Sequence, residues 1–294
     1  MAMSDWNFQP ITIDNFKTAA DFLVGERVTE FGITPTCLYA PLDGAEAAPL
    51  SNGFLCRYFE GGQLCYSLFC DRDEALAKSV YAKLLAEGPL RMKYLSAERL
   101  ERLKNWFPDK TFTVETDENQ SDYLYRREDF LRLEGRAARH KREHYRAFLE
   151  RVPYEYREIT AVDRDACMQV TNAWCSRKDC RDCEYSCERD LIAQLFDRWE
   201  DFPCRGGLIL SEGTPLGFFI GEKLGDTVIG YHQKTVTTQL EGLTHAVYLD
   251  SIRNTFPDVD YVNLGPDIGI EGLRRLKRQF KPFELLHKYT VTVS

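Results

Sequence analysis

Three consecutive strand-like segments in the second half of the chain constrain its fold more than any other feature. They cover residues 206–213, 214–225 and 226–237, and turns at Gly213 and Gly225 join them. Short apolar segments separated by glycine turns are typical of an antiparallel meander. Helical patterns come before the meander, and a helix, a strand, a second helix and a last strand follow it. This order predicts an α/β protein of the α+β type, with mixed sheets.

The order of elements resembles the acyltransferase fold of the GNAT type, in which two central strands separate to admit a thioester or another acyl donor. Residues 53–117 show the same order in a less regular form, and an amphipathic helix is predicted before them at 12–25. We therefore expect two GNAT-like domains in tandem, 1–133 and 134–294, the second of which begins with a basic helix.

Charge and composition exclude several classes of protein. The 294 residues carry a formal net charge of -8, which argues against non-specific binding of nucleic acid or membranes by the whole surface. No segment approaches the roughly 20 apolar residues that a membrane-spanning helix needs, and the first residues lack the pattern of a signal peptide. We therefore expect a cytoplasmic protein without a membrane-spanning segment. The sequence does not define an oligomeric state.

One short stretch departs from this acidic balance. The segment GRAARHKREHYRAF, residues 135–148, is rich in arginine, lysine and histidine. Helical spacing places Arg139, Arg142 and Arg146 along one face, and guanidinium groups match phosphate oxygens with two hydrogen bonds at once. We expect Arg139 and Arg142 to bind the phosphates of a donor. A solvated helix between the two domains is the alternative interpretation.

Two longer motifs resemble one known family. Residues 121–148, followed by YEYREI at 154–159, resemble the passage from an aspartate–tyrosine pair into a basic helix in the phosphatidylglycerol lysyltransferase C-terminal-domain-like family. The tail at 259–291 resembles the ending of the same family, with its aspartate-x-glycine-x-x-glycine-leucine-arginine run and closing lysine–tyrosine pair. The resemblance extends from about Phe8 to the end of the chain. It implies a tandem GNAT-like fold, akin to transferases that move amino acids from aminoacyl-tRNA.

The resemblance also implies a set of functional residues, most of them for binding a donor. On the basic helix and in the C-terminal motif they are Arg136, Lys141, Arg142 and His144, then Asn263, Asp267, Gly269, Gly272, Leu273, Arg274 and Lys277. The chain departs from the family at two places. Leu264, Gly265 and Pro266 replace the usual arginine and acidic residues, and Gln233 stands where relatives often have a glutamate. Because glutamine is not a base at neutral pH, lost or changed activity is an alternative.

A second phosphate-binding element is expected at residues 239–244, QLEGLT. GNAT enzymes hold a donor pyrophosphate with a short Gln/Arg-x-x-Gly-x-Gly/Ala loop that opens a helix. Gln239 and Gly242 fit this loop, whereas Thr244 replaces its small final residue. Glycine permits close approach of the backbone, and the free N–H groups at a helix N-terminus bind anions. An ordinary turn into a helix is the alternative.

Acyl transfer needs a base for the attacking group and hydrogen-bond donors for the developing oxyanion. Strand alternation places Tyr231 on one face of the segment 226–237 and His232 on the other. Tyr231 or His232 is the expected proton-transfer group, and Asp267 is expected to orient an amine. Each of these residues is equally compatible with an ordinary buried or surface position.

The segment WCSRKDCRDCEYSC concentrates thiols in a chain for which we expect no disulfides. It contains Cys175, Cys180, Cys183 and Cys187. Four thiolates form a closed tetrahedral site for a structural zinc ion, and the Cys180-x-x-Cys183 spacing is typical of zinc sites. An iron–sulfur cluster is a second interpretation, and free thiols are a third. The family resemblance does not require a metal here.

Together these features favour an acyl or aminoacyl transferase that uses aminoacyl-tRNA or acyl-coenzyme A as its co-substrate. A further cofactor is not required, and tRNA or coenzyme A is the expected partner. One alternative is a catalytically silent GNAT-like module that binds a phosphate-containing ligand. Another is an interaction protein that metal stabilises at the cysteine cluster.

Overall fold

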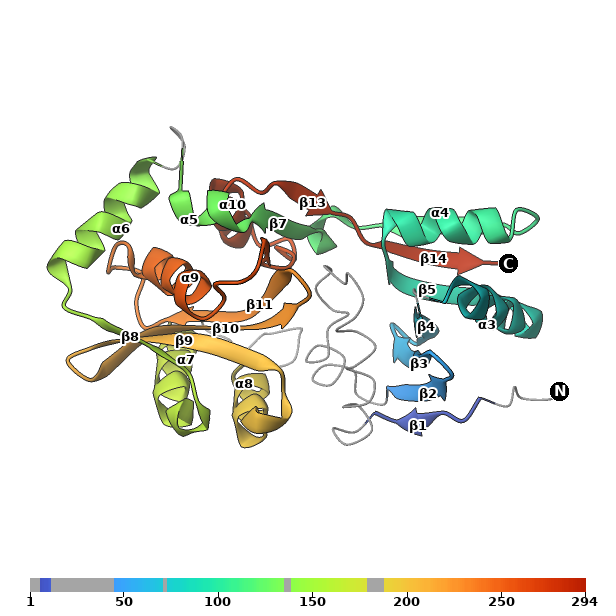
Figure 1. Ribbon diagram of the computed structural model, residues 1–294, viewed down its shortest axis with the longest axis horizontal. Helices are drawn as coiled ribbons and strands as arrows, with labels where there is room; N and C mark the ends of the chain where they lie inside the picture. The colour runs from blue at the N-terminus through green and yellow to red at the C-terminus, as the bar shows by residue number, and fades with distance from the viewer. Residues whose placement is uncertain (1–5, 12–44, 71–72, 135–138, 179–187) are drawn as a thin grey trace. The chain divides into compact units, whose positions relative to one another are not determined.

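The computed structural model describes residues 6–11, 45–70, 73–134, 139–178 and 188–294. These residues form two compact units. Where described, the first comprises the residues up to Asp122 with 266–269 and 285–294, and the second comprises 123–265 with 270–284. Each unit contains a mixed sheet with helices packed on it (Figure 1). The expected fold class, an α/β protein of the tandem GNAT-like type, is confirmed.

Within the described residues, the sheet of the first unit has seven strands in the order β1-β2-β3-β4-β5-β14-β6. The three strands β2, β3 and β4 form an antiparallel meander, whereas β4 and β5 are parallel and pair at Tyr66 and Met92. The strands are β1 (Gln9–Pro10), β2 (Glu46–Leu50), β3 (Gly53–Glu60), β4 (Gln63–Phe69), β5 (Leu90–Leu95), β14 (Tyr289–Val293) and β6 (Phe112–Thr116).

Two helices, α3 (Glu74–Glu87) and α4 (Ala97–Trp106), share one core with this sheet. They bury Leu84 and Leu103 together with Met92 of β5 and Val291 of β14. The N-cap of α3 is Asp73, whose carboxylate accepts the backbone N–H of Leu76 at 2.9 Å. The helix predicted at 12–25 lies outside the described residues.

The sheet of the second unit has the described order β13-β7-β12-β11-β10-β9-β8. The strands from β8 to β11 are antiparallel, β11 and β12 are parallel, and β7 is antiparallel to β12. The predicted meander corresponds to β9, β10 and β11. The strands are β13 (Glu284–Leu286), β7 (Asp122–Arg126), β12 (Tyr261–Asn263), β11 (Thr227–Thr235), β10 (Thr214–Leu224), β9 (Cys204–Ser211) and β8 (Glu155–Glu158).

Helices cover both faces of this second sheet (Figure 1). Phe218 of β10 belongs to the core beneath α7 (Arg164–Lys178) and α8 (Glu188–Asp197). Its neighbour Phe219 belongs to the opposite core, beneath α9 (Leu243–Asn254). That second core also contains side chains from α5 (Arg127–Arg132) and α6 (Arg139–Arg151), with Phe280 after α10 (Glu271–Gln279). No helix in the described part of the chain is long and apolar enough to cross a membrane.

Each sheet incorporates one strand from a distant part of the chain. β14, at the C-terminus, lies between β5 and β6, and β7 lies between β12 and β13. The single last strand predicted at 283–293 is therefore wrong, because β13 and β14 belong to different sheets. At the break, Nζ of Lys288 forms a buried ion pair with Asp122 at 2.6 Å. The predicted domains, 1–133 and 134–294, are contiguous, whereas the compact units exchange these segments.

The parallel strands β11 and β12 stay together over a short distance only. Their register runs from Thr227 opposite Tyr261 to Ile229 opposite Asn263, where β12 ends. From there to Thr235, β11 pairs with β10 alone among the described strands. The structure thus contains the separation of central strands that the GNAT-like order of elements predicts.

Candidate functional site

A β-bulge on β11 brings two predicted catalytic side chains to the same face of the sheet. The register with β10 shifts between Ile220 and Gly221, so that Tyr231 is the extra residue. Tyr231 packs against the core of α7 and α8, and His232 bonds to Glu188 of α8. The expectation that these two side chains lie on opposite faces is therefore wrong, because the bulge interrupts the period of two.

Glu188, at the start of α8, receives two partners from β11. Its Oε1 lies 2.9 Å from Nδ1 of His232 and 2.6 Å from Nζ of Lys234. Burial alone would raise the pKa of Glu188, but the His232 hydrogen bond and the Lys234 charge outweigh burial and lower this pKa to about 2. Glu188 is therefore ionised at neutral pH. Sequence reasoning missed it because its histidine partner is 44 positions away and no motif links the two.

The hydroxyl of Tyr231 and the imidazole of His232 differ in availability. Tyr231 donates to Oε2 of Glu222 on β10 at 2.6 Å, and Glu222 is fully buried. Nε2 of His232 makes no hydrogen bond to any residue that the structure describes. The hydroxyl of Tyr231 is thus already bonded, whereas Nε2 of His232 is available to a reacting group.

The first turn of α9 has the properties of an anion site. Its N-cap, Gly242, has a φ of 87°, and no side chain caps the free N–H groups. The first turn contains no acidic residue, and Thr244 lies in it half-buried. Before the helix, the backbone N–H of Gln239 donates to Oγ1 of Thr237 at 3.0 Å. The predicted phosphate loop therefore does open a helix. The first turn itself contains no carboxylate, and the exposed Glu241, just before the N-cap, lies 3.7 Å from Nε2 of His144.

Two buried side chains beside this turn lack hydrogen-bond partners among the described residues. Lys141 of α6 is 4% exposed, and both ring nitrogens of His245, the third residue of α9, are buried. Nζ of Lys141 lies 3.3 Å from the centre of the Phe280 ring, and the centre of the His245 ring lies 5.8 Å from the same point. An anion would supply the missing partner of the amine.

Burial changes the protonation of both side chains. It lowers the pKa of Lys141 to about 7. Burial, followed by the charge of Lys141 and of nearby histidines, lowers the pKa of His245 to about 4. The imidazole is therefore neutral at pH 7, while the amine is close to its midpoint, where a nearby anion would favour the protonated form. His245 was not predicted, because a single histidine inside a helix carries no motif.

The first unit presents a different helix start after its own meander. The N-cap of α3 is Asp73, and Glu74 lies in the first turn. Asp73 occupies the N–H of Leu76, and both carboxylates repel an anion. The features of an anion site are thus found at α9 and not at α3.

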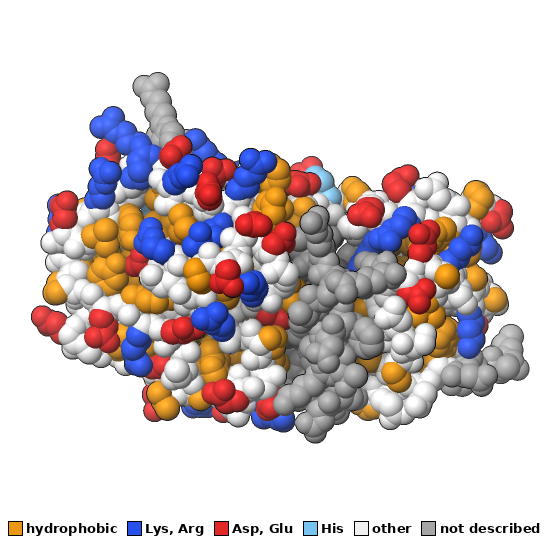
Figure 2. All heavy atoms as spheres, in the orientation of Figure 1, with side chains coloured by type: hydrophobic (Ala, Val, Ile, Leu, Met, Phe, Trp, Pro, Cys, Tyr) orange, Lys and Arg blue, Asp and Glu red, His pale blue; other side chains and the backbone are white. Residues whose placement is uncertain are grey.

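The basic helix α6 presents its charges to solvent as well as to the interior. Figure 2 shows Lys and Arg side chains gathered over α6. Arg139 is exposed and pairs with Glu143 at 2.7 Å, and Arg142 donates to a backbone oxygen at the end of α5. His144 packs its backbone against the N-cap of α9. Arg136 lies outside the described residues.

Residues of the C-terminal motif bond to the backbone around them. Oδ1 of Asn263 accepts the N–H of Gly265 at 2.7 Å, and Oδ1 of Asp267 accepts the N–H of Gly269 at 2.9 Å. Nζ of Lys277 donates to two carbonyl oxygens of the chain after β12, at 2.6 and 3.0 Å. These bonds explain the motif as a device that shapes loops, and direct contact with a donor stays a prediction. Three further members lie on α10: Gly272, Leu273 and Arg274.

Of the cysteine cluster, the structure describes Cys175 alone, half-buried on α7 with a free thiol. Cys180, Cys183 and Cys187 lie outside the described residues. Within the described part of the chain, no group of three or more histidine, cysteine, aspartate or glutamate side chains is arranged to hold a metal ion. Zinc binding by the cluster therefore stays a prediction.

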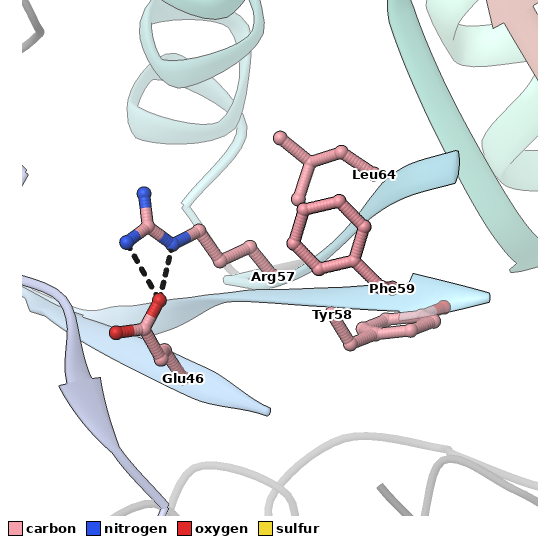
Figure 3. Close-up of a pocket in the computed structure, with 5 residues that line it drawn as sticks. All are labelled: Glu46, Arg57, Tyr58, Phe59 and Leu64. Atoms are coloured by element: carbon pink, nitrogen blue, oxygen red, sulfur yellow. Dashed lines mark hydrogen bonds and ion pairs between the residues drawn. The ribbon is translucent and has the colours of Figure 1, made fainter. Parts of the chain in front are cut away.

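A hollow of about 220 Å³ on the first unit is unrelated to these residues (Figure 3). It is lined by Glu46, Arg57, Tyr58, Phe59 and Leu64. The guanidinium of Arg57 is paired with Glu46 at 2.6 Å and lies 4.0 Å from the centre of the Phe8 ring. Its cation is already paired with Glu46, and burial raises the pKa of Tyr58, whose hydroxyl lies 3.3 Å from Oγ of Ser67. This hollow therefore offers little for acyl transfer.

The two sheets, the diverging strands β11 and β12 and the helix start at α9 define a protein with the tandem GNAT-like fold. Its sequence assigns the protein to one family within this fold. Residues 70–292 match the family described as phosphatidylglycerol lysyltransferase, C-terminal, and the chain belongs to this family. The resemblance inferred from the two motifs is confirmed. A comparison with curated proteins finds no match to this sequence.

Several solved structures share the fold. A conserved protein of unknown function from Bacteroides thetaiotaomicron is similar over 98% of this chain and 100% of its own, with a TM-score of 0.87 and 23% identity. L-PGS from Bacillus licheniformis is similar over 99% of this chain and 93% of its own, with a TM-score of 0.63 and 14% identity. FemX is similar over 97% and 96%, with a TM-score of 0.63 and 10% identity. At these identities the likeness concerns the fold alone.

Proposed function

We propose that the chain is an acyl or aminoacyl transferase whose donor binds to the second unit. One observation carries the proposal: β11 leaves β12 after Ile229, presents His232 at a bulge, and leads into an uncapped helix start beside the unpartnered amine of Lys141. A donor phosphate fits the helix start, and the acyl carbonyl then lies along the open part of β11.

An aminoacyl-tRNA is the donor that we favour over acyl-coenzyme A. The family is described by lysyl transfer, and the charges of α6 extend over an exposed surface, as a polynucleotide backbone requires. Arg139, Arg142 and Lys141 would contact phosphates, with Gln239 and Thr244 at the helix start. Arg136, His144, Asn263, Arg274 and Lys277 complete the proposed donor set. A cytoplasmic location, where aminoacyl-tRNA is made, fits this donor.

The proposed roles in the reaction follow from the contacts of each side chain. His232 takes the proton of the attacking group, since its Nε2 is available. Tyr231 holds the bulge through its bond to Glu222. Asp267 is proposed to orient an acceptor amine, and its Oδ1 accepts the backbone N–H of Gly269.

Binding and transfer are tested separately. Bulk aminoacyl-tRNA, deacylated tRNA, acetyl-coenzyme A and free coenzyme A are each titrated in a thermal-shift experiment. The proposal expects a stabilising shift with one donor, lost in an Arg139→Ala, Arg142→Ala double variant. Lys104→Ala, which removes an exposed cation from α4, should keep the shift. Labelled donor is then offered to amine and hydroxyl acceptors, including phosphatidylglycerol vesicles. No shift with any donor would overturn the proposal.

A catalytically silent binding module is the second candidate. Gln233 replaces an acidic residue that relatives often carry, and the loop Leu264-Gly265-Pro266 lacks the usual charges. Saturable donor binding without acyl transfer to any acceptor would favour this candidate.

For the cysteine cluster we keep the proposal of a structural zinc ion, which rests on the sequence alone. Cys175 is the described member, at the end of α7 that leads toward the other three. Elemental analysis of protein purified without chelators should find about one zinc per chain, and a Cys180→Ser, Cys183→Ser variant should lose it. Metal-free protein would end this proposal.

A further inference from the structure

Two residues that flank Gln233 on β11 converge on one carboxylate. His232 and Lys234 both reach Oε1 of Glu188, at 2.9 and 2.6 Å. We propose that Glu188 and Lys234 are positioning residues that hold His232 as the neutral general base of the transfer reaction. The inference rests on the proposed function, because it assigns a role in that reaction. It adds Glu188 and Lys234 to the site.

The hydrogen bond to Glu188 selects one tautomer of His232. An ionised carboxylate can only accept, and Glu188 is ionised at neutral pH, so Nδ1 of the neutral imidazole carries the hydrogen. The lone pair is then on Nε2, which makes no hydrogen bond to a described residue. A carboxylate behind a histidine fixes both its tautomer and the orientation of its ring. The side chain of His232 is 13% exposed.

Lys234 balances the charge of this carboxylate. A lone buried carboxylate beside an imidazole stabilises the imidazolium, which cannot accept a proton. The Lys234 ammonium shares the same Oε1, and its side chain is 6% exposed, so its charge acts at short range in a buried setting. The face of the Trp174 ring, 4.1 Å from Nζ, holds the ammonium in place. The Lys234 ammonium thus offsets the negative charge of Glu188 beside the imidazole of His232.

The other charged groups near this end of β11 are already bonded. Glu222 of β10 accepts the hydroxyl of Tyr231 at 2.6 Å. Arg177 of α7 donates to the backbone oxygen of Thr235 at 2.5 Å. Among the described residues, the charged groups bonded at this end of β11 are therefore Glu188, Lys234, Glu222 and Arg177.

The proposed step consumes only donor and acceptor. Nε2 of His232 takes a proton from the attacking amine or hydroxyl while that nitrogen or oxygen bonds to the carbonyl carbon of the donor ester or thioester. The tetrahedral intermediate then breaks the bond between this carbon and the leaving oxygen or sulfur. The imidazolium returns its proton to the leaving atom, and His232 ends neutral.

The test begins with the imidazole itself and needs no substrate. The chain has five histidines, so an NMR spectrum of His232→Gln identifies the resonances of His232. In the wild-type protein at neutral pH, the ¹⁵N shifts should show hydrogen on Nδ1. A tautomer with hydrogen on Nε2 would overturn the proposal, whether or not any variant folds.

Two variants should then move the midpoint of the His232 titration in opposite directions. Glu188→Gln removes the carboxylate and should lower the midpoint by about one pH unit, and Lys234→Met removes the opposing cation and should raise it by a similar amount. Asp190→Asn changes an exposed carboxylate of the same helix, paired with Arg189, and should leave it unchanged. Shifts of the same sign, or none in either variant, would contradict the assigned roles.

Kinetics separate this inference from the proposed function. With the donor found by titration, the acidic limb of kcat/KM should shift with the NMR midpoints, and Glu188→Gln should lower kcat about 10–100-fold with KM little changed. Added imidazole should restore part of the activity of His232→Ala. Transfer activity that is unaffected in His232→Ala would overturn the inference and leave the proposed function standing. If the two variants shift the His232 midpoint in opposite directions but no donor supports transfer, the proposed function and the role of His232 in it are overturned.

Discussion

The backbone oxygen of His144 lies 2.2 Å from the point where a β-carbon on Gly242 would stand, and the β-carbon of Phe148 lies 2.7 Å from it. Gly242 also has a φ of 87°, a region that L side chains rarely adopt. The backbone of α6 therefore packs directly on the N-cap of α9. This close contact places Lys141 of α6 beside the first turn of α9.

We expect Gly242→Ala to lower the free energy of unfolding by about 2–4 kcal/mol, because the added methyl group meets backbone and the φ becomes strained. Urea unfolding followed by circular dichroism measures the change. Gly272→Ala is the matched control: its added β-carbon meets no heavy atom within 4 Å, and alanine favours a helix over glycine by about 1 kcal/mol. Equal losses in both variants would contradict the packing of α6 on α9.

A second prediction concerns the stability cost of Lys141. Its pKa is lowered by burial from 10.5 to about 7, so between these pH values the unfolded chain binds more protons and stability rises with pH. Lys141→Met removes the buried amine. We expect this variant to be more stable than the wild type by about 1–3 kcal/mol at pH 6, with the difference shrinking between pH 7 and 10.

Chemical denaturation of both proteins at pH 6, 8 and 9.5 measures this difference. Lys104→Met, at an exposed lysine of α4, should show no such dependence on pH. A Lys141→Met difference that stays constant across the three pH values would mean that the amine is already solvated.

The protonation of Lys141 also predicts how donor affinity changes with pH. An anion beside Lys141 favours the ammonium and raises the pKa of this group above its value of about 7 in the free protein. Donor affinity should therefore fall as pH rises above about 7, by up to tenfold per pH unit. Lys141→Met should bind more weakly and without this pH dependence, and Lys141→Arg, which stays charged, should also lose the dependence. Parallel pH profiles for all three proteins would remove Lys141 from the donor site.

Local periodicity explains which parts of the fold were predicted. The meander at 206–237, the helix after it and the basic helix follow from apolar spacing and glycine turns within short windows. The bulge at Tyr231 was missed, because an extra residue in a strand leaves no mark on the alternation. The exchange of β14 was missed for another reason: 283–293 reads as one continuous strand, and its division depends on Lys288 meeting a residue 166 positions away.

The candidate site likewise contains residues that the sequence predicts and residues that it does not. Lys141 and Gly242 were predicted from separate motifs, and the structure brings the helices that carry them into contact. Glu188, Lys234 and His245 were not predicted as functional, because their significance lies in contacts across distant parts of the chain and in burial, neither of which a spacing rule contains. The amino-acid composition, likewise, does not indicate which buried polar side chains lack a hydrogen-bond partner.

The last prediction concerns the ion pair at the start of the C-terminal strand. Nζ of Lys288 lies 2.6 Å from Oδ1 of Asp122, and both side chains are almost completely buried in the first unit. Lys288→Met would leave the Asp122 carboxylate buried without its cation. We expect the free energy of unfolding of the first unit to fall by about 3–5 kcal/mol, because a buried charge without its partner costs more free energy than the absence of both charges.

Hydrogen exchange can locate this loss. Amides of β5 and β6, the neighbours of β14, should lose protection in Lys288→Met, while amides of β9, β10 and β11 keep theirs. Adding Asp122→Asn to this variant should recover part of the stability, because the amide no longer buries a charge. Lys104→Met again serves as the exposed control. Equal loss of protection in both sheets would mean that the exchanged strand supports the whole chain as one cooperative unit. Unchanged amide protection in the first sheet would show that β14 is held by its backbone pairing without help from the ion pair.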